Sequence, residues 1–252
     1  MNLFDLTGKV AVVTGGSSGN GQSIAYGLAQ AGADVAVVGN TSPLDKTKKL
    51  IESTGRRCLP IKTDLRDIHE AKTKIIDSTM KEFGRIDILV NNAGIQRRNP
   101  VMVFTEKDWD DVLAVNLKSV FILSQGVAPI MQKNGWGKII NMASMLSFQG
   151  GLNVPAYAAS KGGIAQLTKA MANEWSKYGI NVNAMAPGYI VTKMNTALIS
   201  DKERSRQILE RIPAGRWGEP TDLIGGAIFL SSHASDYVDG HVLCIDGGWM
   251  GR

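Results

Sequence analysis

Near its start the chain reads Val10-Ala11-Val12-Val13-Thr14-Gly15-Gly16-Ser17-Ser18-Gly19-Asn20-Gly21, an apolar run that leads directly into a glycine-rich turn. The run favours a buried strand, and the residues from Gly21 onward favour a helix. Glycines in a strand-to-helix turn let backbone N–H groups approach a pyrophosphate, which the helix N-terminus attracts. The spacing is G-x-x-x-G-x-G, whereas the general dinucleotide fingerprint is G-x-G-x-x-G. The turn predicts a nucleotide site, and an ordinary tight turn is the alternative.

The rest of the chain repeats this alternation of short apolar runs and longer helix-like segments. Helical spacing of apolar residues predicts helices over 21–31, 67–83, 105–131, 157–178 and 221–232. Pro60 weakens the third strand, because proline cannot donate to a sheet ladder, and Pro129 is expected to end or kink the long helix. Strands are predicted at 9–13, 34–38, 58–62, 86–90, 138–142, 181–185 and 241–245. Such repeated alternation indicates an α/β fold with a parallel sheet and helices on both faces.

Length and composition indicate one ordinary globular domain. The chain has 252 residues, of which 44% are hydrophobic and 20% charged, so a disordered or collagen-like chain is excluded. We predict a single domain over 1–252, whose least regular part, 189–216, has the position of a lid over the strand ends. Cys58 and Cys244 are too few for a disulfide framework and are expected to be reduced core thiols in a cytoplasmic protein. No stretch approaches the roughly 18 apolar residues that span a membrane.

The positive charge of the chain is small and scattered. Lysine and arginine number 28 against 23 acids, which gives a net charge of +5. The densest basic spots, Lys46, Lys48 and Lys49 and then Arg204, Arg206 and Arg211, lie near acids in helix-like segments. Solvated helix faces explain such runs better than a nucleic-acid footprint. Aromatic residues make up 6% without clustering, so a base-stacking platform is not indicated. We therefore predict neither a nucleic-acid nor a membrane partner.

Tyr157 and Lys161 carry the strongest chemical signal. Their i, i+4 spacing places the phenol and the ammonium on one helical face. The ordinary tyrosine pKa of about 10 is too high for efficient acid–base work near neutrality. A cation within ~4 Å supplies about 4 kcal/mol to the phenolate at an effective dielectric of ~20, so Lys161 is predicted to lower the pKa of Tyr157. Ser144, just past a strand, is placed to hydrogen-bond the same substrate oxygen, and a surface Tyr–Lys pair is the alternative.

Together these motifs resemble the short-chain dehydrogenase/reductase family over essentially the whole chain. The resemblance implies a single Rossmann domain with a doubly wound, seven-stranded parallel sheet. It implies an NAD(P)-dependent oxidoreductase that needs no metal, because hydride passes directly between the nicotinamide and the substrate carbon. Family members are mostly homotetramers. The matching residues are Thr14-Gly15, Gly19, Gly21, Asn91-Asn92-Ala93-Gly94, Asn116, Ser144, Tyr157, Lys161 and Pro187-Gly188.

The resemblance also implies a role for each site residue. Tyr157 is the implied general acid/base, and Lys161 lowers its pKa and binds the nicotinamide ribose. Ser144 orients the substrate carbonyl, and Asn116 holds a water that links Lys161 to solvent. Asn20 departs from the family, which usually has an aliphatic residue there. The implied cofactor-binding residues are Gly15, Ser17, Ser18, Gly19, Asn20, Gly21, Asn40, Asp64, Leu65, Asn92, Ala93, Gly94, Tyr157, Lys161, Pro187, Gly188, Ile190 and Thr192.

The choice between NAD and NADP depends on the residues after the second strand. An acid about 20 residues beyond the glycine turn binds the ribose 2′-OH of NAD, and an arginine favours NADP. The chain has Gly39-Asn40-Thr41-Ser42 at this point, with neither charge. We predict NAD, because a 2′-phosphate finds no strong charged partner there. Lys46 overturns this prediction if its helix turns inward.

The substrate prediction comes from residues 94–98, 143–151 and 212–218, which look like the corresponding segments of sugar-acid members of the family. Arg97 and Arg98 are predicted to bind a carboxylate, and two solvated loop arginines are the alternative. Met145, Gln149 and Tyr189 are the other pocket candidates. The resemblance implies a sugar acid of the 2-dehydro-3-deoxy-D-gluconate or 2-deoxy-D-gluconate class.

Other functions share part of this pattern. Gluconate 5-dehydrogenases and 3-oxoacyl-carrier-protein reductases have the same core motifs, so a substrate panel is needed to separate them. A dinucleotide sensor without turnover is an alternative of a different class. Such a sensor has no need of Ser144, Tyr157 and Lys161 together, which argues against it.

Overall fold

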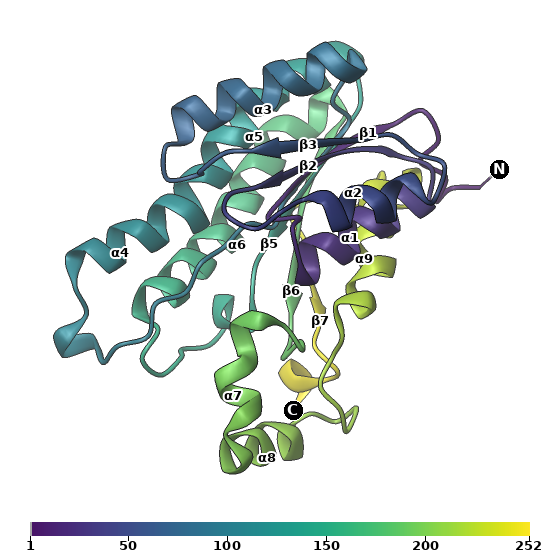
Figure 1. The fold of residues 1–252 in the computed structure, drawn as a ribbon. Helices are drawn as coiled ribbons and strands as arrows, with labels where there is room; N and C mark the ends of the chain where they lie inside the picture. Colours follow the sequence, from purple (N-terminus) through teal and green to yellow (C-terminus); the bar gives the residue numbers. More distant parts are fainter. Residues whose placement is uncertain (1) are drawn as a thin grey trace.

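A computed structural model describes residues 2–252 and contains one seven-stranded parallel sheet (Figure 1). The strand order is β3-β2-β1-β4-β5-β6-β7, so the chain winds outward from β1 first in one direction and then in the other. This is the predicted doubly wound Rossmann architecture. The strands are β1 (Val10–Thr14), β2 (Asp34–Gly39), β3 (Cys58–Lys62), β4 (Ile88–Asn91), β5 (Gly137–Met142), β6 (Ile180–Pro187) and β7 (Val242–Ile245).

Nine α-helices accompany the strands within residues 2–252. On one face α1 and α9 pack together, and on the other face α3 packs on α5 and α4 on α6. The short α7 and α8 lie beyond the ends of β6 and β7, beside the C-terminus (Figure 1). The helices are α1 (Gly19–Gln30), α2 (Asp45–Glu52), α3 (Ile68–Phe83), α4 (Glu106–Leu113), α5 (Ser119–Asn134), α6 (Pro155–Trp175), α7 (Thr196–Ser200), α8 (Lys202–Arg211) and α9 (Ile224–Ser231).

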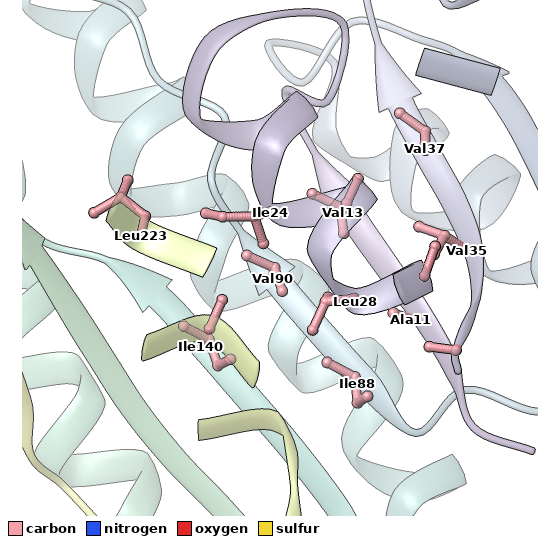
Figure 2. Close-up of a cluster of buried hydrophobic side chains, with 14 of the residues drawn as sticks. Ala11, Val13, Ile24, Leu28, Val35, Val37, Ile88, Val90, Ile140 and Leu223 are labelled. Atoms are coloured by element: carbon pink, nitrogen blue, oxygen red, sulfur yellow. The ribbon is translucent and has the colours of Figure 1, made fainter. Parts of the chain in front are cut away.

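Successive residues of the inner strands enter two separate cores. Val13 packs with Ile24 and Leu28 of α1 on one face, as Figure 2 shows, whereas Val12 enters the core on the other face. All of β1 is therefore buried. Burial on both faces explains why the inner strands read as continuous apolar runs rather than as alternating ones.

Pro60 lies in β3, at one edge of the sheet, where it faces Val37 of β2. An edge strand tolerates proline because its missing N–H need not serve a second neighbour. Cys58 lies in the same edge strand, and Cys244 lies in β7 at the opposite edge. Both thiols are free, but the prediction of two core thiols is wrong for Cys244, which is exposed.

The long helical stretch Glu106–Asn134 corrects two predictions. It is not ended by Pro129, which lies inside α5. The interruption is instead a π-helical turn, Ala114–Lys118. Val127 before the proline and Met131 after it both pack in the core, which holds α5 together across Pro129. By length and composition alone this stretch is long and apolar enough to cross a membrane, contrary to the prediction that no segment is, but within the fold α5 packs on α3 and β5.

The segment 189–216 contains α7 and α8 and projects from the sheet as a compact unit. Ile190 pairs with Gly218, so the chain leaves and rejoins the body at one point. A small core of Met145, Ile208, Ile212 and Trp249 lies beneath α8. Trp249 belongs to the C-terminal tail, which therefore folds against its own subunit. We call 189–216 the lid segment, after the role predicted for it from the sequence.

Candidate active site

The glycine turn after β1 is packed tightly against the end of β4. Gly15 adopts a positive φ of 66°, and a Cβ on Gly21 would collide with the carbonyl oxygen of Gly15 and the side chain of Asn92. Asn92 Nδ2 donates to the carbonyl oxygen of Thr14 over 2.9 Å. The turn thus leads into the N-terminus of α1, where the first backbone N–H groups of the helix have no intrahelical partner and can bind an anion. Side chains in place of these glycines would fill the space above the turn. The open space fits a dinucleotide pyrophosphate.

Ser144 is held at the end of β5 by a network that reaches α6. Its backbone N–H donates to Ser147 Oγ over 3.2 Å, and Ser147 Oγ donates to the carbonyl oxygen of Lys161 over 2.7 Å. Ser144 Oγ also accepts from the N–H of Leu146. Because the same network includes the backbone of Lys161, it fixes the Ser144 hydroxyl relative to the helix that carries Tyr157 and Lys161.

Tyr157 and Lys161 lie one turn apart on α6, which begins with Pro155. The Tyr157 phenol forms a hydrogen bond with Ser144. Burial raises the pKa of Tyr157, while that hydrogen bond and the positive charge of Arg98 lower it. The predicted lowering by Lys161 is not observed: Nζ lies 5.6 Å from the tyrosine ring centroid and donates to the carbonyl oxygen of Met142. Burial itself lowers the pKa of Lys161 to about 8.

Asn116 lies in the π-helical turn and is almost fully buried. Its Oδ1 accepts from the N–H of Ile95 over 2.8 Å, and its Nδ2 donates to the Ile95 carbonyl oxygen over 3.0 Å and to Ser160 Oγ over 3.3 Å. The side chain therefore fixes the loop after Gly94. The water path from Lys161 stays a prediction.

A cavity of about 860 Å³ opens at the carboxyl ends of the strands and brings most of the predicted residues together. Asn116 lies outside it. Asn20 Oδ1 is buried at this cavity without a hydrogen-bond partner. The predicted residues that line the cavity are Gly15, Ser17, Ser18, Gly19, Asn20, Gly21, Asn92, Ala93, Gly94, Arg98, Ser144, Met145, Gln149, Tyr157, Lys161, Pro187, Gly188, Tyr189, Ile190 and Thr192.

A second cavity, of about 310 Å³, continues from the glycine turn toward the ends of β2 and β3. Asn40, Asp64 and Leu65 line it, as predicted for the adenosine half of a dinucleotide. Arg66 lines it too and binds Asp64, which lowers the pKa of that carboxyl to about 2. Lys46 does not line this cavity.

The family comparison agrees with this geometry. The family model for short chain dehydrogenases matches residues 9–203. The chain belongs to the short-chain dehydrogenase family. It is therefore an oxidoreductase that uses a nicotinamide dinucleotide, and the predicted fold and family are confirmed.

Individual relatives of this dehydrogenase match it over its whole length. It is 54% identical to the 2-dehydro-3-deoxy-D-gluconate 5-dehydrogenase of Escherichia coli K12, over 100% of this chain and 99% of that one. A solved structure from Agrobacterium tumefaciens with bound NADP has 49% identity and a TM-score of 0.94, with 100% of both chains covered. The gluconate 5-dehydrogenase of Burkholderia cenocepacia, in complex with NADP and tartrate, has 42% identity and a TM-score of 0.92, with 100% of this chain and 98% of that one covered. The bound NADP in both structures does not support the predicted preference for NAD.

The structure separates the two arginines that were predicted to act together. Arg98 lines the large cavity. Arg97 instead lines the second cavity and forms an ion pair of 3.3 Å with Asp108. Arg97 is thus not brought together with the other substrate candidates, because consecutive residues of this extended loop point to different sides.

Sequence reasoning missed one whole wall of the dehydrogenase site. Arg204, Gln207 and Arg211 of α8 line the large cavity, and so does Trp249 of the tail. The arginines of this helix were interpreted as a solvated face, and Arg204 and Arg211 are indeed exposed, but they also line the cavity, which the sequence did not indicate. The spacing i, i+3, i+7 was visible in the sequence, but the direction in which that face points was not.

Proposed function

We propose that this dehydrogenase transfers a hydride between a nicotinamide dinucleotide and a hydroxyl or keto group of a sugar acid of the 2-dehydro-3-deoxy-D-gluconate class. The observation that carries the proposal is the large cavity, in which Ser144 and Tyr157 share a space with arginines of the loop and of α8. Cationic side chains beside a proton-transfer pair suit a substrate that has both a carboxylate and a reacting carbonyl. The name of the Escherichia coli relative supports the same class.

The proton chemistry belongs to Tyr157. The raised pKa keeps its phenol protonated at neutral pH, which is the form that donates a proton to a carbonyl oxygen as a ketone is reduced. In the opposite direction the phenolate accepts the proton of the alcohol. Ser144, hydrogen-bonded to the same phenol, orients the substrate oxygen toward it. The charge of Arg98 favours the phenolate and so assists the oxidation direction.

The cofactor supplies hydride chemistry when bound, and the chain supplies its seat. The glycine turn and the N-terminus of α1 suit the pyrophosphate, and Lys161 at the floor of the cavity suits the nicotinamide ribose. Asn20 fits the same interpretation, because its orphaned Oδ1 lacks a partner that an amide of the cofactor would provide.

We further propose that the adenosine cavity accepts NADP(H) as well as NAD(H). Asn40 carries no charge to repel a 2′-phosphate, and two cationic side chains, Arg66 and Arg97, line this cavity. The NADP-bound relatives support this choice. The test is the ratio of kcat/KM for the two cofactors, which we expect to lie within about tenfold. A preference above about a hundredfold for either would contradict it.

Three wider assignments are proposals too. We propose a homotetramer, because α4 and α5 leave Trp109 37% and Phe121 41% exposed, and native mass spectrometry tests it. We propose a cytoplasmic location, which the two free thiols suit, and cell fractionation tests it. We also propose one catalytic unit without nucleic-acid or membrane partners, in which the lid segment covers the bound substrate.

A substrate panel tests the main proposal. It holds 2-dehydro-3-deoxygluconate, 2-deoxygluconate, gluconate, 5-ketogluconate and an acetoacetyl thioester, each with both cofactors. We expect the deoxy sugar acids to give the highest kcat/KM. Turnover of gluconate, its keto form or the thioester alone would replace the substrate and keep the chemistry. Cofactor binding without any turnover would favour the sensor.

A further inference from the structure

Helix α8 has two basic faces in different environments. On its outer face Arg206 binds Glu203 over 2.8 Å and also pairs with Glu210. On its inner face Arg204 and Arg211 line the large cavity. Neither forms an ion pair with any carboxylate in residues 2–252. Unpaired guanidinium groups on a cavity wall are a site for an anion, whereas a guanidinium between two glutamates is not.

The inner face is fixed to the catalytic floor by the small core under α8. Ile208 packs with Met145, the residue next to Ser144, and with Trp249. The Arg211 guanidinium carbon lies 4.0 Å from the centroid of the Trp249 ring, which orients its fork. Arg204 is held by a hydrogen bond from Nη1 to Gln207 Oε1, another lining residue. The cations are therefore positioned before a ligand binds.

We infer that Arg204 and Arg211 bind the carboxylate of the substrate and thereby hold the lid segment over the cavity. The inference rests on the proposed function and adds the residues that recognise the acid group. Arg98 acts at the other end of the substrate, since its charge affects the Tyr157 phenol. In a 5-dehydrogenase the reacting carbon and the carboxylate are four carbon–carbon bonds apart, so the two ends need different partners. Binding of the carboxylate would select acids over neutral sugars, and α8 lies between Ile190 and Gly218, which pair where the segment leaves and rejoins the body.

The experiment compares the two faces of α8. Arg204→Gln, Arg211→Gln and the matched outer-face control Arg206→Gln are assayed with the sugar acid that wild type turns over best and with its neutral primary amide. Hydrogen bonds to charged groups are worth about 1.5–3 kcal/mol, so each inner variant should raise KM for the acid about 10- to 100-fold. KM for the amide, kcat/KM of Arg206→Gln and the cofactor Kd should stay within about twofold of wild type.

Further variants keep the test decisive. Arg211→Gln could expose Trp249 and loosen the lid segment, which a lower Tm would show. In that case Arg204→Gln and Arg211→Lys are compared with wild type instead, since lysine keeps the charge. A binding measurement supplies a readout without turnover. The Kd of the sugar acid is measured by tryptophan fluorescence for the Tyr157→Phe variant with reduced cofactor bound. We expect that affinity to fall about tenfold or more when Arg204→Gln is added.

The outcomes separate the two proposals. Wild type that turns over no sugar acid would overturn the proposed function and this inference with it. Wild type that turns over the acid, with KM unchanged in both inner variants or raised equally for acid and amide, would overturn the inference alone. A charge-specific rise in Arg98→Gln only would assign the carboxylate to the loop and would also overturn it.

Discussion

The two walls of the large cavity are built in different ways. The cofactor wall consists of the turn after β1 and the loops after β4 and β6, where small residues bring backbone close to the ligand. The lid wall consists of α8 and the tail, where long side chains reach inward from a helix held by its own small core. Steric constraint governs the first wall, and charge governs the second. Substitutions in the cofactor wall should therefore change how well the cofactor fits. Substitutions in the lid wall should change how tightly an anionic substrate binds.

A substitution at the floor between the two walls should give the largest loss of activity. Tyr157→Phe removes the proton donor and leaves the ring, so we expect kcat to fall about a thousandfold. The cofactor Kd, measured by fluorescence of the reduced form, should stay within about threefold. Residual kcat within tenfold of wild type would mean that another group transfers the proton.

The cofactor wall should not tolerate added volume. In Gly21→Ala the new Cβ meets the backbone of Gly15, and such overpacking typically costs about 1–3 kcal/mol. We expect a lower Tm and a cofactor Kd raised about tenfold or more. The matched control is Gly225→Ala in α9, where an added Cβ meets nothing within 4 Å and helix propensity gains up to about 1 kcal/mol. Equal behaviour of the two variants would contradict the steric account.

The buried charge of Lys161 lowers the stability of the fold at a position that the active site needs. Burial lowers its pKa to about 8 in the native state, against 10.5 in the unfolded chain. The unfolded chain therefore binds more protons between these values, and wild-type stability rises with pH across this window. Below pH 8 we expect Lys161→Met to be inactive yet more stable by about 1–3 kcal/mol in free energy of unfolding. Chemical denaturation at pH 7 and pH 10 measures it. A gain that does not shrink at pH 10 would contradict the buried-charge explanation.

The neighbouring loop arginines should give a smaller contrast. Arg98→Ala should raise KM for the substrate several-fold, because Arg98 lines the large cavity. Arg97→Ala should leave that KM within about twofold, because Arg97 pairs with Asp108 and lines the adenosine cavity. Steady-state kinetics with saturating cofactor measures both. The reverse pattern would return the substrate role to Arg97.

What the sequence could predict follows the same division between the walls. The strands, the glycine turn and the Ser144–Tyr157–Lys161 set were predictable, because close backbone approach and helical spacing leave local patterns. The position of Arg204 and Arg211 on the cavity wall was not, because the charged residues of α8 show the same pattern on both faces and only tertiary packing decides which face points inward. Burial was also invisible locally: it raises the pKa of Tyr157, which the Tyr–Lys spacing alone predicted to fall.

We propose that the cavity selects a sugar acid, that hydride passes between the substrate and the nicotinamide cofactor, and that Tyr157 transfers the proton. The most direct measurement is the ratio of kcat/KM for 2-dehydro-3-deoxygluconate to that for an acetoacetyl thioester, with the preferred cofactor. We expect a ratio above about a hundred, because only the acid brings a carboxylate to the cationic wall. A ratio below one would contradict it and would identify the enzyme as a reductase of acyl thioesters.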